Sequence, residues 1–287
     1  MAVFYLIFTC FFPEMIDKLF QAVYTTIEQE GQGLFETGKE KPEEREVDIL
    51  VKKEKYKDMQ EKNLPFDADS QKAVVTQMAR DMEEYHLKEV CTELIWDLIP
   101  QINEINVRLS KECGRQVMDN ITWRVKAPES IVKKLKRKGR KLTFDCALET
   151  LNDLAGIRVI CSFQDDVYRM AEEIRDIPGL RIVKEKNYIA HPKDSGYRSI
   201  HLIVEYNGDG AFMDECCEAA DIRESLRAEI QIRSVAMNYW AILDHQLCYK
   251  NEKKEAQKIK KELKACAIAI AKIDKRFLKL RKRIEDL

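Results

Sequence analysis

The chain has 287 residues, of which 45% are hydrophobic and 34% are charged, and its net charge is −1 at pH 7. This length allows one large domain with helical extensions, and the hydrophobic fraction is sufficient for a buried core. The near-zero net charge excludes a protein that binds polyanions over its whole surface, so any anion site must be a local group of basic residues.

Cysteine and histidine spacing gives no sign of zinc or of a disulfide scaffold. The nine cysteines are an odd number without a CxxC pair, and the four histidines form no HExxH motif. Zinc sites and small secreted disulfide-rich domains rely on regular spacings of these residues. The sequence therefore predicts reduced thiols, no zinc and a cytoplasmic location.

The N-terminal part of the chain is expected to be an extension or linker over residues 1–70, without a predicted function. The apolar run 2–12 is shorter than the ~20 residues that span a bilayer, and it lacks the basic flank of a signal peptide. Residues 28–70 are rich in glycine and acidic residues. We expect no transmembrane segment here, while a docking segment, a membrane-surface anchor and a signal-like element stay open for residues 2–12.

A helical region is predicted for residues 71–120, because apolar residues from Gln71 to Cys113 recur mostly at spacings of three, four or seven. Pro100 is expected to break or kink this helix. From residue 121 to 249 the pattern changes to short strands alternating with helices, which predicts a mixed β-sheet covered by helices and an α+β fold. The expected strands are 121–125, 156–163, 181–189, 198–206 and 227–234, and the expected helices are 128–139, 144–152, 165–177 and 234–250.

The last segment, residues 250–287, is predicted to be a helix with a heptad pattern. Its apolar residues follow steps of four and three for nearly four heptads. Such a seam favours oligomerisation, although packing on the protein's own helix at 71–113 would use the same pattern. The seam consists of Ile259, Leu263, Cys266, Ile270, Ile273, Phe277, Leu280 and Ile284.

The most basic segment is WRVKAPESIVKKLKRKGRK, residues 123–141, with nine lysines and arginines and one acid. Arg124 and Lys126 share one face of an extended segment, and Ser130, Lys134 and Arg137 share one face of the helix that Pro128 begins. These two groups could surround a triphosphate. A solvated amphipathic helix would show the same charges.

Two further segments contain acids at strands. In LNDLAGIRVICSF, Asp153 lies before a strand that contains Arg158, and a carboxylate in this position is suited to Mg²⁺ together with phosphate oxygens. In RAEIQIRS, Glu229, Gln231 and Arg233 alternate with apolar residues and share one face. Glu229 could hold Mg²⁺ or accept a proton from an attacking hydroxyl group.

The segment NYIAHPKDSGYRSIHLIVEY, residues 187–206, joins a polar turn to a strand. Lys193 and Arg198 could bind phosphate, and Tyr197 could stack on a nucleobase. Alternation places His201 opposite Ile200 and Leu202, so this histidine need not lie in the core. Taken singly, each of these features is compatible with a purely structural role, whereas together they indicate a nucleotide site.

Four motifs, in their order and spacing, resemble the synthetase domain of the RelA/SpoT family, and most of all its single-domain small alarmone synthetases. They are RVKAPESIVKKLKRKG, DLAGIRVI, NYIAHPKDSGYRSIHL and AEIQIRSVAMNYWAILDHQLCYK. The resemblance covers roughly residues 95–287, with a synthetase core at 121–249. It implies a nucleotidyltransferase-like fold and assembly of a homotetramer through the terminal helices.

The resemblance also implies a reaction of the stringent response, in which the β,γ-pyrophosphate of ATP moves to the ribose 3′-hydroxyl of GTP or GDP and leaves AMP. Asp153 and Glu229 would hold Mg²⁺, with Glu229 as general base, and Tyr197 would stack on guanine. The implied ATP-binding residues are Arg124, Lys126, Ser130, Lys134, Arg137 and Arg158. The implied acceptor-binding residues are Lys186, Lys193, Tyr197, His201 and Asn238.

Departures from the family pattern concern the acceptor side. Asn187 and Asp244 stand where the family usually has aspartate and glutamate, so the preference among GMP, GDP and GTP is open. The chain contains no His-Asp dipeptide, and hydrolysis of the product is therefore not expected. Two alternatives remain, namely a toxic relative that modifies the tRNA 3′ end and a non-catalytic module that binds nucleotides or RNA.

Overall fold

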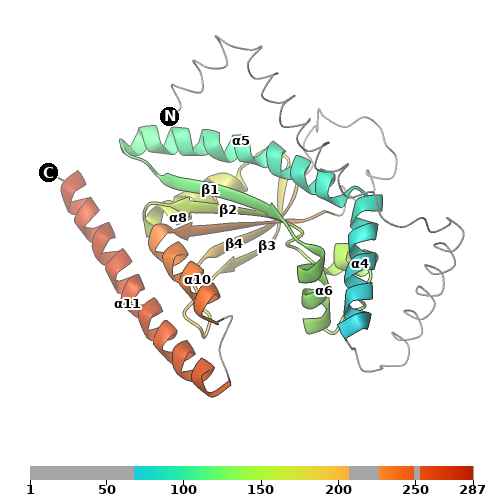
Figure 1. Cartoon of the computed structure of the whole chain (residues 1–287). Helices are drawn as coiled ribbons and strands as arrows, with labels where there is room; N and C mark the ends of the chain where they lie inside the picture. The colour runs from blue at the N-terminus through green and yellow to red at the C-terminus, as the bar shows by residue number, and fades with distance from the viewer. Residues whose placement is uncertain (1–67, 207–225, 249–252, 287) are drawn as a thin grey trace, which may run out of the picture. The chain divides into compact units, whose positions relative to one another are not determined.

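The computed structural model describes residues 68–206, 226–248 and 253–286, which lie within one unit spanning residues 64–287 (Figure 1). The expectations for residues 1–67 concern a part of the chain outside the described residues. The helices are α4 (Ala68–Glu84), α5 (Leu87–Cys113), α6 (Pro128–Arg137), α7 (Phe144–Thr150), α8 (Gln164–Arg175), α10 (Val235–Cys248) and α11 (Lys253–Glu285). The strands are β1 (Met118–Val125), β2 (Ala155–Cys161), β3 (Leu180–Asn187), β4 (Ile200–Tyr206) and β5 (Ala228–Ser234).

A five-stranded mixed sheet forms the centre of this unit, with the strand order β1-β2-β5-β4-β3. Only β2 and β5 run parallel to each other, and the other neighbouring pairs are antiparallel. The prediction of a mixed α+β fold is confirmed, and β1 begins three residues earlier than expected. The parallel pair lies inside the sheet, where each of its strands has a neighbouring strand on both sides.

The two faces of the sheet differ in character because the central strands alternate between apolar and polar residues. Ile157, Ile230 and Leu202 are paired in register and are at most 1% exposed. Helices α5 and α8 pack against the sheet (Figure 1). The apolar face therefore forms the core, and the opposite face is free to carry charged side chains.

The prediction of a break at Pro100 is wrong. Helix α5 continues through Pro100 from Leu87 to Cys113, and the helical region is interrupted instead at His86, which has a left-handed backbone conformation (φ 50°). Helix α4 turns away there and packs on α6. Proline removes one helical hydrogen bond, and the packing of α5 on the sheet holds the helix together despite that loss.

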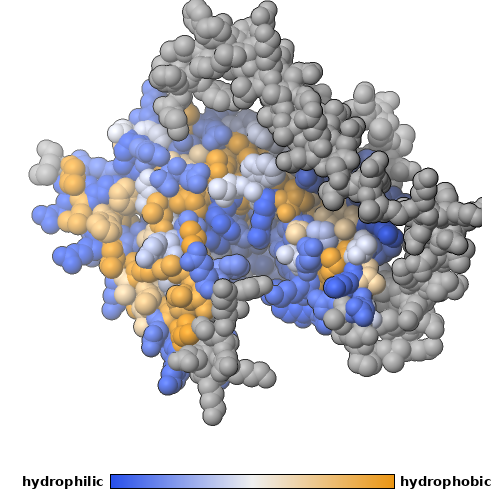
Figure 2. All heavy atoms as spheres, viewed as in Figure 1, coloured by the Kyte–Doolittle hydropathy of each residue, from blue (hydrophilic) through white to orange (hydrophobic). Residues whose placement is uncertain are grey.

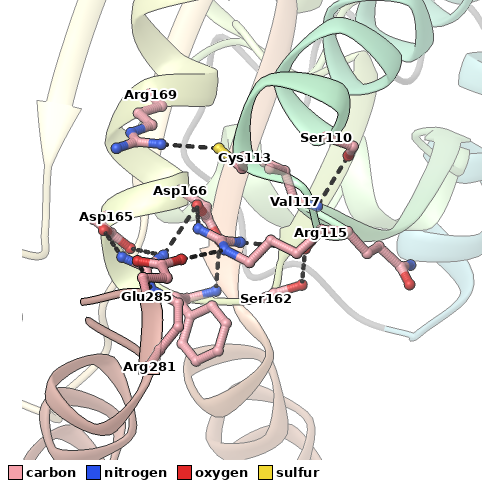
Figure 3. A network of polar contacts seen from close by, with 12 residues as sticks. Ser110, Cys113, Arg115, Val117, Ser162, Asp165, Asp166, Arg169, Arg281 and Glu285 are labelled. Carbon is pink, nitrogen blue, oxygen red and sulfur yellow. Dashed lines mark hydrogen bonds and ion pairs between the residues drawn. The ribbon is translucent and has the colours of Figure 1, made fainter. Parts of the chain in front are cut away.

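Helix α11 packs on α10 and α8, and its C-terminal end is held by a polar network (Figure 3). Arg281 binds Asp165 and Arg115 binds Asp166 through paired hydrogen bonds. Both guanidinium groups also lie over the ring of Phe163, at 5.0 and 5.2 Å from its centroid. Since Asp166 is fully buried, these contacts determine where the last turns of α11 lie.

The predicted heptad seam is divided between two environments. Leu263 is buried together with Trp240 of α10, whereas Ile273, Phe277 and Ile284 are 51–70% exposed. Figure 2 shows apolar residues gathered on this side of the molecule, over α10 and α11. Among the described helices, none combines the length and the hydrophobicity needed to cross a membrane.

Candidate active site

A row of polar side chains crosses the sheet on the face opposite to the apolar core. The register pairs Arg158 with Gln231, Gln231 with His201 and His201 with Lys186. Paired residues on neighbouring strands share a face. Glu229 lies two residues before Gln231 on the same face, so four strands contribute predicted site residues to one surface.

A pocket of about 190 Å³ opens over β1, β2 and β5. It brings together Arg124, Asp153, Arg158 and Glu229, which come from three separate segments of the sequence. Figure 2 shows hydrophilic residues around this central hollow. The residues that line the pocket are Thr122, Trp123, Arg124, Asp153, Gly156, Ile157, Arg158, Glu229 and Gln231.

Asp153 is the acid of this pocket with the strongest cationic environment. Its Oδ2 accepts hydrogen bonds from Lys126 Nζ at 2.6 Å and from Lys134 Nζ at 2.7 Å. Burial alone would raise the pKa of Asp153, but the hydrogen bonds from the two lysines lower it further than burial raises it. Its Oδ1 is buried and has no hydrogen-bond partner among the described residues. The carboxylate is therefore ionised and keeps one oxygen available for a ligand.

Helix α6 has the amphipathic character that its sequence predicts. Ile131 and Leu135 are fully buried. Lys134 lies outside this buried face, and its side chain forms an ion pair with Asp153. Ser130 and Arg137 are exposed on the side of Lys134. The basic segment is therefore more than a solvated surface, since at least two of its lysines converge on the pocket.

Arg158 also lines the pocket. Its Nε is buried without a hydrogen-bond partner among the described residues. Burial lowers the pKa of Arg158, and the charges of Arg233 and Arg124 lower it further. An arginine stays protonated in proteins, so this accumulation of positive charge makes the pocket a binding site for an anion.

Glu229 and His201 form a close pair on the polar face. His201 Nδ1 lies 2.8 Å from Glu229 Oε1, and Gln231 Nε2 donates to the other carboxylate oxygen at 2.8 Å. Burial raises the pKa of Glu229, yet the contacts with His201 and Gln231 lower it to about 2. Burial lowers the pKa of His201 despite the neighbouring carboxylate. The pair is therefore an ionised glutamate beside a neutral histidine.

The polar turn at residues 193–197 lies beside this pair. Its ends are closed by backbone hydrogen bonds between Lys193 and Tyr197 and between Gly196 and Lys193. The Tyr197 hydroxyl lies 2.7 Å from His201 Nε2. Lys193 Nζ lies 4.7 Å from the centroid of the Tyr197 ring. A base can therefore stack on this side of the ring only after the Lys193 side chain has moved away. Burial lowers the pKa of Lys193, with a further contribution from Lys186.

Two asparagines of the acceptor side differ in their environment. Asn238 lies on α10, and its Oδ1 is buried without a hydrogen-bond partner among the described residues. Asn187 Oδ1 accepts hydrogen bonds from the backbone N–H groups of Ile189 and Ala190, at 3.1 and 2.9 Å. An aspartate could accept the same two bonds, so this turn does not require a charged side chain at residue 187.

Three residues near Glu229 were given no role by the sequence analysis. Tyr188 packs edge-on against Tyr197 and His201, at centroid distances of 5.9 and 5.2 Å. Arg233 Nη2 donates to the Tyr197 hydroxyl at 2.5 Å and to Gln231 Oε1 at 2.8 Å. The alternation of EIQIR places Gln231 and Arg233 on the face of Glu229, which is the signal that points to them.

The described residues contain no group of three or more His, Cys, Asp and Glu side chains that could hold a metal ion. Asp153 and Glu229 nevertheless line one pocket, and Asp153 has a free buried oxygen. Mg²⁺ is commonly held by one or two carboxylates together with substrate phosphates and water. The two acids fit this kind of site, in which the nucleotide supplies the remaining ligands.

Comparison with known proteins agrees with this site. Residues 123–254 match the RelA_SpoT family, described as a region found in RelA / SpoT proteins. GTP pyrophosphokinase YwaC of Bacillus subtilis is 38% identical over 172 residues, which cover 60% of this chain and 78% of that protein. GTP pyrophosphokinase YjbM of the same organism is 30% identical over 194 residues, which cover 68% and 86%.

Solved structures give the same result for the fold. Small alarmone synthetase 1 of Bacillus subtilis, bound to its product pppGpp, superposes with a TM-score of 0.60 and 28% identity, over 71% of this chain and 98% of that chain. A GTP pyrophosphokinase family protein of Streptococcus pneumoniae superposes with a TM-score of 0.59 and 31% identity, over 71% and 96%. The resemblance drawn from the four sequence motifs is confirmed.

Proposed function

We propose, on the premise that the chain belongs to the RelA/SpoT family, that it transfers the β,γ-pyrophosphate of ATP to the ribose 3′-hydroxyl of GTP or GDP, with AMP as the second product. The observation that carries this proposal is the convergence of Asp153 and Glu229 on one cationic pocket. Related proteins named GTP pyrophosphokinase support it. Pure binding of a nucleotide would require neither acid.

The ATP side of the proposed site is the cationic pocket around Asp153. Lys126 and Lys134 converge on it, and Arg158 lines it with Arg124. Phosphoryl transfer depends on positioning and on neutralising the negative charge of the phosphates. We therefore assign Arg124, Lys126, Ser130, Lys134, Arg137 and Arg158 to the binding of ATP.

Asp153 and Glu229 would hold Mg²⁺ in the proposed enzyme. The ion would neutralise charge on the transferred phosphates. Asp153 has both of the properties that this role needs, because it is ionised and keeps Oδ1 free of protein partners. Its pairing with Lys126 and Lys134 also places the phosphate-binding lysines next to the metal ligand.

The acceptor side of the proposed site is the surface formed by β3, β4, the turn 193–197 and α10. Lys186 and Lys193 supply positive charge for the acceptor phosphates, and Tyr197 supplies a ring that can stack on guanine once Lys193 turns toward a phosphate. His201 and Asn238 complete the set. The unpartnered Oδ1 of Asn238 is suited to accept a hydrogen bond from the acceptor nucleotide.

Glu229 is the proposed general base toward the 3′-hydroxyl. With a pKa of about 2 in the free protein, this carboxylate is ionised but weakly basic. Bound phosphates bring negative charge beside Glu229 and raise its pKa, because a like charge disfavours the ionised form. Binding of both nucleotides thus moves the carboxylate toward the basicity that proton transfer requires.

The direct test is an assay of purified protein with ATP, Mg²⁺ and each of GMP, GDP and GTP. We expect AMP and a 3′-pyrophosphorylated guanine nucleotide, and we expect Glu229→Gln to remove most turnover without unfolding the protein. Labelled ATP offered together with tRNA and GDP distinguishes a tRNA-modifying relative. A folded protein that binds ATP but produces neither product would overturn the proposal.

Assembly through the terminal helices is part of this proposal. Val235, Tyr239 and Ile242 form an exposed apolar face on α10, and Phe277 and Ile284 lie on the exposed face of α11. Apolar residues at spacings of three and four on an exposed helix face are typical of a helix–helix interface. We propose a homo-oligomer, with a tetramer as the expected state, and light scattering that finds a monomer at micromolar concentration would contradict it.

A further inference from the structure

Arg233 is a buried cation that the proposed reaction leaves without a role. It lies on β5, four residues after Glu229, and is only 6% exposed. Its guanidinium group forms hydrogen bonds and lies 4.9 Å from the centroid of the Tyr197 ring. Within the described residues it has no carboxylate partner, and its Nε has no hydrogen-bond partner. A buried charge of this kind is costly, so its position calls for a functional explanation.

Two arms of hydrogen bonds begin at one nitrogen of Arg233. The short arm runs from Nη2 to Gln231 Oε1 at 2.8 Å, and from Gln231 Nε2 to Glu229 Oε2 at 2.8 Å. The long arm runs from Nη2 to the Tyr197 hydroxyl at 2.5 Å, on to His201 Nε2 at 2.7 Å, and from His201 Nδ1 to Glu229 Oε1 at 2.8 Å. The five side chains therefore form a closed ring.

The direction of every bond in this ring follows from its chemistry. A guanidinium group only donates hydrogen bonds, so the Tyr197 oxygen accepts from Arg233 and its own O–H donates to His201 Nε2. His201 is then a neutral imidazole with its hydrogen on Nδ1, which donates to Glu229. Along the other arm, Gln231 must present its carbonyl oxygen to Arg233 and its NH₂ group to Glu229. Both arms deliver a donor to Glu229, one to each carboxylate oxygen.

We propose that Arg233 is a positioning residue that orients both oxygens of Glu229 and ties them to Tyr197 of the acceptor-binding turn. This inference rests on the proposed function, in which Glu229 faces the acceptor hydroxyl. Polar networks in a partly buried site have few alternative arrangements, because an unsatisfied member is costly there. The ring fixes the position of the Glu229 carboxylate relative to the turn. A reaction that depends on the alignment of the acceptor hydroxyl with its base benefits from such fixed geometry.

Three variants separate the two arms. Arg233→Met removes both arms, Gln231→Met removes the short arm, and Tyr197→Phe removes the long arm. Arg233→Met is expected to lower kcat by ~10-fold to 100-fold, the range typical of groups that orient a functional side chain. The KM for ATP should stay within about twofold of the wild-type value, because none of the residues assigned to ATP binding is changed.

Hydrogen exchange of the turn gives a readout that does not depend on turnover. The N–H groups of Lys193 and Gly196 are bonded within the turn. Their exchange should become faster in Arg233→Met and in Tyr197→Phe and stay unchanged in Gln231→Met. Combining Arg233→Met with Tyr197→Phe should add little to the loss in kcat or to the exchange rate, because both changes cut the same long arm.

Three outcomes would overturn this proposal, namely unchanged exchange of the turn in Arg233→Met, unchanged kcat in that variant, or fully additive effects in the double variant. A large increase in the KM for ATP would instead identify Arg233 as a direct ligand of the ATP phosphates and would also overturn it. If Arg233→Met does not fold, Gln231→Met with Tyr197→Phe provides the same comparison at half-buried residues. Faster exchange in Arg233→Met, together with a wild-type protein that shows no turnover, would refute the proposed function and leave only the connection between Arg233 and the turn.

Discussion

A Cβ atom added to Gly196 would lie 2.4 Å from the Cβ atom of Ala267 on α11. The backbone of Gly196 has a positive φ of 95°, and Arg198 Nη1 donates to the carbonyl oxygens of both Gly196 and Ala267. Tyr197 packs against the cluster that Leu263 and Ala267 of α11 form with Trp240 of α10. The acceptor-binding turn is therefore seated directly on the C-terminal helix.

Gly196→Ala is predicted to displace the turn, since it adds both the strain of a positive φ and a clash with α11. We expect the KM for the guanine nucleotide to rise ~10-fold or more, with the KM for ATP nearly unchanged. Gly114→Ala is the matched control, because Gly114 also has a positive φ but no atom within 4 Å of the added Cβ. Equal effects of both substitutions on the acceptor KM would contradict the seating of the turn on α11.

Asp153→Asn is predicted to separate binding from turnover. The change removes a proposed metal ligand, but it also frees Lys126 and Lys134 from the carboxylate that now neutralises them. We expect Mg²⁺-dependent turnover to fall by about 10³-fold or more, while calorimetry in EDTA shows ATP binding that is retained or tighter. Asp119→Asn, at an exposed residue of β1, should change neither quantity. Loss of ATP binding in EDTA would show that Asp153 organises the lysines rather than competing with the phosphates.

Most of the fold could be predicted from the sequence because its strands and helices have different periods. The alternation in IHLIVEY and AEIQIRS and the spacing in α6 are local patterns, and these elements lie within one to two residues of the predicted bounds. The break near residue 86 could not be predicted in this way. His86 adopts a left-handed conformation that no proline or glycine announces, and Pro100 is tolerated because tertiary packing outweighs its local effect.

The candidate site shows the same limit at the level of side chains. Alternation is sufficient to place Glu229, Gln231 and Arg233 on one face. It says nothing about which strand lies next to β5, so the contacts of Arg233 with Tyr197 and of Glu229 with His201 depend on the strand order. The seating of Gly196 on Ala267 joins residues about 70 positions apart and requires the packing of α11.

The pKa of Glu229, about 2 in the folded protein against an ordinary value of 4.5, predicts a pH dependence of stability. A carboxyl group whose pKa is lowered by folding contributes stability above pH 4.5 and loses it as the pH falls toward 2. The gap between the two values sets an upper limit of about 3 to 4 kcal/mol, and the share that comes from the charge of His201 is absent where this histidine is neutral. We therefore expect urea unfolding, with metal chelated, to show that the free energy of unfolding falls less between pH 7 and pH 3 for Glu229→Gln than for the wild type. Glu172→Gln, at an exposed residue of α8, should show the same decrease in the free energy of unfolding as the wild type.

Phe277→Glu tests the exposed face of α11. Phe277 is 57% exposed between Ile273 and Leu280, which are 51% and 43% exposed. A charge placed at the centre of an apolar interface is predicted to weaken assembly by about 2 kcal/mol or more per contact, so light scattering should report a smaller species at the same concentration. Lys275→Glu, on the same helix but outside this face, should leave the mass unchanged. An unchanged mass for Phe277→Glu would place the interface elsewhere.

Arg281→Met tests the network at the end of α11 (Figure 3). Arg281 is 9% exposed and binds Asp165 through two hydrogen bonds, and it lies within 3.7 Å of Asp166. Removing it takes two hydrogen bonds from the half-buried Asp165 and one of the two arginines near the buried Asp166, which is expected to lower the free energy of unfolding by about 2 kcal/mol. Hydrogen exchange should accelerate first in the last turns of α11, before the sheet is affected. Arg283→Met, at an exposed residue of the same turn, should change neither measurement, and equal losses for both variants would mean that the network does not hold the helix.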